Sequence, residues 1–201
     1  MKLYFFISFL CLSFLCIAGC EGTSVNEQRV AVLNALYYQT FEDNSIRIAK
    51  NSYSYESSLK DWDTLSLSEI ESIQAHSLYG DEDSLRKAFT FTDEDIQTFN
   101  NQLNEKPEAF WPRWGWDTPN FISREDYPDY FSGEAQLPPV ERPASKRIRI
   151  ISLSVPLVSS NRAFVAAETN KGYGSVAVDV YLLGKKDGKW VVIAVNNVFT
   201  T

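Results

Sequence analysis

The chain has 201 residues, and its 26 acidic side chains outnumber its 19 Lys and Arg side chains, so the formal net charge is −7. An acidic surface repels phosphates, so neither a nucleic-acid partner nor attraction to anionic lipid head groups is expected. All three cysteines lie within the first 20 residues, and His76 is the only histidine. The rest of the chain therefore offers no disulfide, no thiolate nucleophile and no metal site built from several Cys or His ligands.

The first 19 residues have the pattern of a secretory signal peptide. Lys2 supplies a positive charge, residues 3–17 are almost wholly apolar, and Ala18 and Gly19 are small. The apolar stretch is shorter than the roughly 20 residues that span a bilayer. We therefore expect residues 1–19 to be removed and residues 20–24 to form a short tether. Residues 25–201 then form a single domain, for which the length is sufficient.

The end of this segment, Ile17-Ala18-Gly19-Cys20, resembles the lipobox of bacterial lipoproteins. The resemblance implies transfer of a diacylglyceryl group to the Cys20 thiol, cleavage before Cys20 and acylation of the new amino group. Several acyl chains hold a protein stably on a membrane, whereas one chain alone is marginal. Glu21 is not the aspartate that retains Gram-negative lipoproteins in the inner membrane, so the resemblance favours the outer membrane, on its periplasmic or surface face. The alternative is an ordinary secretory signal with an incidental cysteine.

Local patterns predict several elements in the front half of the domain. Ser24 and Glu27 have the spacing of a capping box, followed by an apolar stripe that predicts a helix over residues 25–41. Thr92, with acidic residues after it, predicts the start of a second helix over residues 93–104. Alternation in residues 45–55 predicts a strand, and the spacing of apolar residues over 65–73 indicates a short helix or an irregular segment.

The last fifty residues predict a four-stranded antiparallel meander over residues 151–199. Asp187-Gly188 lies between two runs of β-branched and aromatic residues, which is a strong hairpin signal. Both faces of the last two strands are apolar, so we expect the sheet to be covered on both sides. Pro156 lacks a backbone N–H, which predicts that the strand containing it is an edge strand or is bulged at that point.

Residues 109–147 form an aromatic-rich segment without a clear period. Trp111, Arg113, Trp114 and Trp116 lie within six consecutive positions. Trp and Arg are enriched at binding hot spots, and Arg113 is placed to stack on a ring. The same residues equally suit a hydrophobic lid on the sheet. We expect most of the rings to act as a lid and one or two to remain exposed, which makes these four residues the candidate binding residues.

No set of residues in the sequence predicts a catalytic, cofactor or metal site. Ser-x-x-Lys occurs at residues 57–60 and 84–87, without the other elements of penicillin-recognising enzymes. The acidic cluster at residues 81–83 lacks the glycine and the distal glutamate of an EF-hand. His76 has no identifiable partner, so a surface or half-buried residue is a simpler interpretation than a general base.

These observations predict an α+β domain, in which N-terminal helices pack on a four- to six-stranded antiparallel sheet with a C-terminal β-meander. Residues 151–156, 163–165, 181–183 and 188–192 are similar to the carboxyl half of many uncharacterised bacterial envelope proteins, sometimes likened to NTF2-like or cystatin-like folds. That resemblance implies a fold and no activity.

For function, the first hypothesis is a non-enzymatic, lipid-anchored module of the cell envelope, held on the membrane through Cys20, that binds a protein or a glycan. The alternative is an envelope enzyme of hydrolase type, with a pocket centred on carboxylates or on His76. A third possibility is a purely structural protein.

Overall fold

The computed structural model describes the helices, strands and connecting segments of residues 24–53, 65–75, 90–105, 108–128, 131, 148–172 and 174–200. Several predictions lie outside these residues. They concern the signal segment with Cys20, His76, both Ser-x-x-Lys motifs, the acidic cluster at 81–83 and most of the aromatic-rich segment beyond residue 128.

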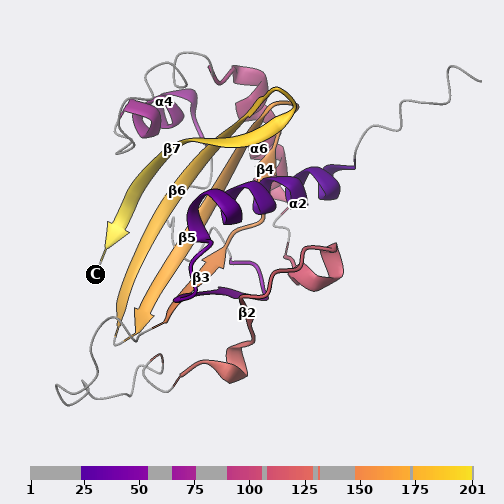
Figure 1. The fold of residues 1–201 in the computed structure, drawn as a ribbon. Coiled ribbons are helices and arrows are strands. Elements are labelled where there is room, and N and C mark those ends of the chain that lie inside the picture. The colour runs from indigo at the N-terminus through magenta and orange to yellow at the C-terminus, as the bar shows by residue number, and fades with distance from the viewer. Residues whose placement is uncertain are drawn as a thin grey trace, which may run out of the picture.

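The fold is an α+β arrangement around one mixed, mostly antiparallel sheet, as the sequence predicts (Figure 1). Within the described residues the sheet has seven strands in the order β2-β1-β3-β5-β6-β7, and β4 pairs with β5. The strands are β1 Ile46–Ala49, β2 Phe121–Ile122, β3 Arg149–Leu153, β4 Leu157–Val158, β5 Arg162–Gly172, β6 Ser175–Lys186 and β7 Lys189–Thr200. The C-terminal meander is present, with β5, β6 and β7 as the longest strands.

The hairpin between β6 and β7 is set by its turn. Lys186 pairs with Lys189, which leaves Asp187 and Gly188 as a two-residue loop. Their φ angles are 51° and 76°, so both central residues have the positive φ of a type I′ turn. This turn matches the right-handed twist of the strands, and it explains why the Asp-Gly pair is a reliable local signal.

Pro156 predicted that its strand is an edge strand or is bulged, and β3, which ends just before Pro156, is not at the edge. β3 is an inner strand, because β1 pairs with it in parallel on one side and β5 pairs with it in antiparallel fashion on the other. The edge alternative therefore does not hold for β3, whereas β4, directly after Pro156, pairs only with β5 among the described strands. The predicted interruption at Pro156 is confirmed, because it separates β3 from β4. At this break the Ser154 hydroxyl accepts a hydrogen bond from the Ala166 N–H at 2.9 Å. The Ser154 hydroxyl thus replaces a backbone carbonyl as the acceptor for one N–H group of β5.

The parallel strands at the other side of the sheet are a second difference from prediction. β1 pairs in parallel with both β2 and β3, so the sheet is mixed and is wider than the expected four to six strands. β2 belongs to the aromatic-rich segment, which therefore contributes a strand rather than only a loop.

Asp43 supports the turn before β1. Its carboxylate accepts a hydrogen bond from the Ser45 N–H at 2.6 Å and lies 3.4 Å from the Arg149 guanidinium of β3.

The helices begin at the predicted caps. α2 (Val25–Leu36) starts with a reciprocal Ser24–Glu27 capping box and continues into the π-helical turn η1 (Tyr37–Phe41), so the helix predicted over residues 25–41 is confirmed. α6 (Asp93–Asn104) starts with a capping box between Thr92 and Asp95. The short helix α4 spans Leu67–Ala75. Among the described residues, none of the helices combines the length and the apolar character needed to cross a bilayer.

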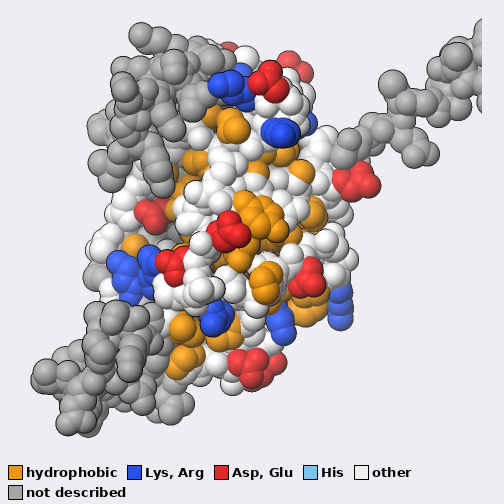
Figure 2. All heavy atoms as spheres, viewed as in Figure 1, with side chains coloured by type: hydrophobic (Ala, Val, Ile, Leu, Met, Phe, Trp, Pro, Cys, Tyr) orange, Lys and Arg blue, Asp and Glu red, His pale blue; other side chains and the backbone are white. Residues whose placement is uncertain are grey.

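The sheet is covered on both faces, as predicted. On one face, α2 and η1 pack on β1, β3 and β5, together with Trp111 and Trp116 of the aromatic-rich segment. On the other face, α4 and α6 pack against Phe164 and residues of β6 and β7. Figure 1 shows α2 on the near side of the sheet, and Figure 2 shows hydrophobic side chains reaching the surface over it, among scattered charged groups. The strands are apolar on both sides because each side meets a separate hydrophobic core.

Candidate functional site

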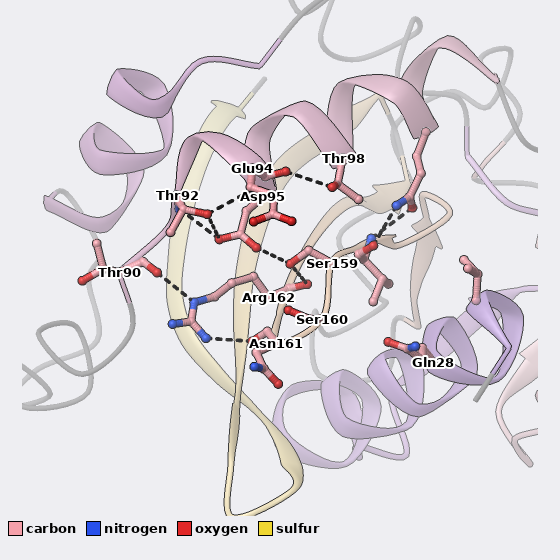
Figure 3. A pocket seen from close by; sticks show the side chains of 13 residues that line it. Gln28, Thr90, Thr92, Glu94, Asp95, Thr98, Ser159, Ser160, Asn161 and Arg162 are labelled. Carbon is pink, nitrogen blue, oxygen red and sulfur yellow. Dashed lines mark hydrogen bonds between the residues drawn. The ribbon is translucent and has the colours of Figure 1, made fainter. Parts of the chain in front are cut away.

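A polar cleft opens where three elements meet: the N-terminal half of α2, the first turns of α6, and the turn between β4 and β5. Its volume is about 480 Å³. Figure 3 shows the side chains that line it, with α6 above, the β4–β5 turn in the middle and α2 below. Most of the lining residues carry hydroxyl, carboxamide or charged groups, among them Thr92, Glu94, Ser159, Asn161 and Arg162, and apolar atoms contribute about half of the lining surface.

The floor of the cleft is built by Gln102 of α6. Its Nε2 donates to the Val158 carbonyl at 2.7 Å, and its Oε1 accepts from the Val158 N–H at 3.1 Å. Val158 belongs to β4, which pairs only with β5 among the described strands. One carboxamide therefore satisfies both backbone groups of Val158, in the way that a neighbouring strand would. This side chain joins α6 to the edge of the sheet at β4, where Val158 is buried.

Gln102 is also joined to α2 through Arg29. The Arg29 side chain is only 6% exposed, and its Nη2 donates to the Gln102 Oε1 at 3.1 Å. Its Nε donates to the Pro156 carbonyl at 3.1 Å. The guanidinium also lies over the Trp114 ring, 5.6 Å from the ring centroid. Arg29 thus connects the floor of the cleft to the aromatic-rich segment.

The wall formed by α6 is held by Asp95. One carboxylate oxygen accepts from the Thr92 N–H and from the Thr92 hydroxyl, both at 2.9 Å. The other oxygen accepts from the Ser159 hydroxyl in the β4–β5 turn. Both oxygens are therefore engaged in capping α6 and in tying α6 to the turn. Arg162 completes this wall, since its Nε donates to the Thr90 carbonyl at 3.1 Å.

One carboxylate and one carboxamide at the rim of the cleft are available for a ligand. Glu94 and Asn161 line the cleft and are exposed (Figure 3). Within the described part of the chain, the Glu94 carboxylate and the Asn161 carboxamide have no hydrogen-bond partner. The cleft therefore combines a rigid polar framework with a rim whose donors and acceptors face solvent.

The four candidate binding residues of the aromatic-rich segment divide into two pairs. Trp111 and Trp116 are 0% and 1% exposed and belong to the core under α2, so a ligand does not reach their faces in this structure. Trp114 is half-buried and Arg113 is exposed. Gly115, with φ of 78°, reverses the chain after the short helix η2 (Trp111–Trp114). This left-handed residue lets the rings on both sides of it enter the same core.

The tryptophans contact one another edge to face. The centroid of the Trp111 ring lies 5.6 Å from that of Trp116 and 5.8 Å from that of Trp114. The Trp116 indole N–H donates to the Asn34 side-chain oxygen of α2 at 3.0 Å. These contacts agree with the expectation that most of the rings act as a lid. Trp114 and Arg113 remain candidate binding residues, because they are half-buried and exposed, respectively.

The cleft was not found by sequence reasoning. Thr92 and the acidic residues after it predict a helix cap, but Gln102, Ser159 and Arg162 carry no local pattern. Only the packing of α6 against β4 brings them together. His76 lies outside the described residues, so the alternative role of a general base remains a prediction.

Two ionisable groups outside the cleft have shifted pKa values. Hydrogen bonds from the Ser45 backbone and side chain, together with the nearby Arg149 charge, lower the pKa of Asp43 below its ordinary value. Burial raises the pKa of Tyr127, and the charge of the Glu168 carboxylate raises it further. The charge of Arg124 and a hydrogen bond with Ser152 partly oppose this increase. Neither Asp43 nor Tyr127 is among the residues that line the cleft. Their pKa shifts therefore give no information about the chemistry of the cleft.

In the described residues, no group of three or more His, Cys, Asp or Glu side chains is arranged to hold a metal ion. No protein family model, no curated protein and no solved structure matches the chain.

Proposed function

We propose that the protein is a lipid-anchored binding module of the bacterial cell envelope, and that its cleft between α2, α6 and the β4–β5 turn binds a glycan. The anchor part of the proposal is supported by the lipobox-like segment that ends at Cys20. The binding part is supported by one observation above all: a cleft whose walls are fixed by internal hydrogen bonds, while the side chains of Glu94 and Asn161 at its rim have no hydrogen-bond partner among the described residues.

The chemistry of the lining favours a hydroxylated ligand. Carboxamide, carboxylate and guanidinium groups are planar and donate or accept hydrogen bonds in pairs, which suits the neighbouring hydroxyls of a sugar ring. Glu94 and Asn161 provide such groups at the rim. Because the walls are already held in place, binding mainly orders the side chains of Glu94 and Asn161, at a cost of about 0.5–1.5 kcal/mol each.

The same contacts favour binding over catalysis. A glycosidase requires two carboxylates placed across the scissile bond, one of them free to donate or accept a proton. In the cleft, both oxygens of Asp95 are committed to Thr92 and Ser159. Asp95 therefore serves as a structural group, and Glu94 is the other carboxylate that we identify at the rim.

The anchor is tested by metabolic labelling with a fatty acid. We expect label to appear in the wild-type protein and to be lost in Cys20→Ser, because the acyl groups are attached through this residue. Cys16→Ser is the matched control and should keep the label, since it changes a cysteine in the segment that is removed. Undiminished labelling of Cys20→Ser would contradict the lipid anchor.

The cleft is tested by isothermal titration with soluble oligosaccharides released from purified bacterial peptidoglycan. We expect the wild-type protein to bind, and Asn161→Ala and Glu94→Gln each to weaken binding by about three- to thirtyfold, the cost of one or two lost hydrogen bonds. Asn104→Ala and Glu71→Gln are matched controls on exposed positions of α6 and α4, and they should bind like the wild type. Absence of binding by the wild type, or equal weakening by the controls, would contradict a glycan site in this cleft.

A further inference from the structure

We infer that one side of the protein rests on the phospholipid head groups, through a surface that we call the aromatic rim: Val25, Phe110, Arg113 and Trp114. This inference rests on the proposed lipid anchor and goes beyond it, because an anchor by itself leaves the orientation of the domain open. It assigns a specific membrane-contacting surface and places the cleft close to the bilayer.

The length of the tether limits where the domain can lie. Only three residues separate Cys20 from Ser24, where the described chain begins. Even fully extended, this stretch places Ser24 no more than about 14 Å from the acylated cysteine. The N-terminal end of α2 must therefore lie near the membrane surface, and whichever side chains surround it face the head groups.

The aromatic rim lies next to this end of α2. The Arg29 guanidinium donates to the Asn26 side chain in the first turn of α2 at 3.4 Å, and it lies over the Trp114 ring. Arg113 in turn lies over the Phe110 ring, with 5.6 Å between the guanidinium carbon and the ring centroid. Figure 1 shows η2, in salmon, beside the N-terminal half of α2, and Figure 2 shows hydrophobic side chains with both basic and acidic side chains around them in this part of the molecule.

The chemistry of the rim suits a membrane interface. Val25 is 50% exposed and Phe110 is 39% exposed, and they are two of the four large hydrophobic side chains that are exposed among the described residues, the others being Tyr38 and Val198. Tryptophan prefers the head-group region, where its ring is amphipathic. Arginine lays its apolar stem along such a surface while its guanidinium pairs with phosphates. The chain as a whole is acidic and is not attracted to anionic head groups. The acyl chains therefore supply the affinity, and the rim sets only the orientation.

The orientation has a consequence for the cleft. Val25 belongs both to the rim and to the lining of the cleft, so the cleft opens beside the membrane. The turn between β5 and β6 lies at the opposite end of the sheet (Figure 1). β5 alone has 11 residues, which extend over about 35 Å. A residue at that turn therefore lies well away from the lipid.

The experiment uses the mature, acylated protein in vesicles of phosphatidylethanolamine and phosphatidylglycerol that contain a nitroxide-labelled lipid as quencher. No cysteine follows Cys20 in the sequence, so an introduced cysteine can be labelled with a fluorophore at one place. Pro112→Cys places the fluorophore on η2, at an exposed position beside Arg113 that leaves the four rim residues unchanged. Lys171→Cys is the matched control, at an exposed position near the far end of β5.

We expect the lipid-borne quencher to act severalfold more strongly on the fluorophore at residue 112 than on the one at residue 171. Adding Arg113→Glu to Pro112→Cys should reduce that quenching while the protein still sediments with the vesicles, because the charge then repels phosphates. Equal quenching at the two positions in a protein that sediments would overturn the rim while leaving the anchor in place. A protein that fails to sediment and whose Cys20 thiol accepts the fluorophore would instead overturn the lipid anchor, and the rim with it.

Discussion

Gln102→Leu is expected to lower the free energy of unfolding by about 3–5 kcal/mol, which is a large fraction of the stability of a typical domain. Leucine has nearly the same volume but neither accepts nor donates. The change leaves the N–H and the carbonyl of Val158 without the partners they have in the structure, and it removes a hydrogen bond from the buried Arg29. An unsatisfied buried polar group costs about 1–3 kcal/mol, more when it is charged.

The measurement is chemical denaturation followed by far-ultraviolet circular dichroism. Asn101→Leu is the matched control, because Asn101 is the exposed neighbour on the same helix, and it should change stability by less than about 0.5 kcal/mol. Arg29→Met combined with Gln102→Leu should recover part of the loss, since the buried charge is then removed as well. If Gln102→Leu and Asn101→Leu had the same denaturation midpoint, the proposed role of the carboxamide would be wrong.

Trp116→Ala is expected to destabilise the protein by about 3–5 kcal/mol, the usual cost of removing a large buried aromatic side chain. The ring packs edge to face on Trp111 and on Phe121 of β2, with centroids 5.6 Å and 5.3 Å away. Its indole N–H also joins the aromatic-rich segment to Asn34 of α2. Loss of the ring opens a cavity between α2 and the segment that carries β2.

Two companion variants make this prediction specific. Trp116→Phe keeps most of the buried area but loses the hydrogen bond to Asn34, so it should cost less than the alanine variant. Trp114→Ala, two positions earlier, removes a ring that is only half-buried and should also cost less. Equal destabilisation by Trp114→Ala and Trp116→Ala in a denaturation experiment would show that the two rings contribute alike, contrary to the structure.

The aromatic-rich segment shows how far composition can be used to predict a site. Three tryptophans near an arginine indicated either a lid or a binding surface, and the sequence favoured the lid for most of the rings. The structure places Trp111 and Trp116 in the core and leaves Trp114 at its margin. Composition alone does not decide this, because the orientation of each ring depends on the turn at Gly115 and on the position of α2 above it.

The parts of the fold that the sequence determined are those governed by residues close together in the chain. Capping boxes depend on side chains three positions apart, and the type I′ turn depends on two adjacent residues, so Ser24, Thr92 and Asp187-Gly188 predicted their elements correctly. The apolar character of both faces of the last strands likewise predicted that the sheet is covered on both sides. Each of these features follows from backbone geometry or from local burial.

Only the tertiary structure decided the parallel pairing of β1 and the construction of the cleft. β1 and β3 are about a hundred residues apart, and Gln102 reaches Val158 across 56 positions. Contacts at such separations arise when helices settle on the sheet and buried polar groups find partners, and they leave no repeat or spacing in the sequence. The elements themselves could therefore be predicted, whereas the place where they meet could not, because it depends on packing between distant segments.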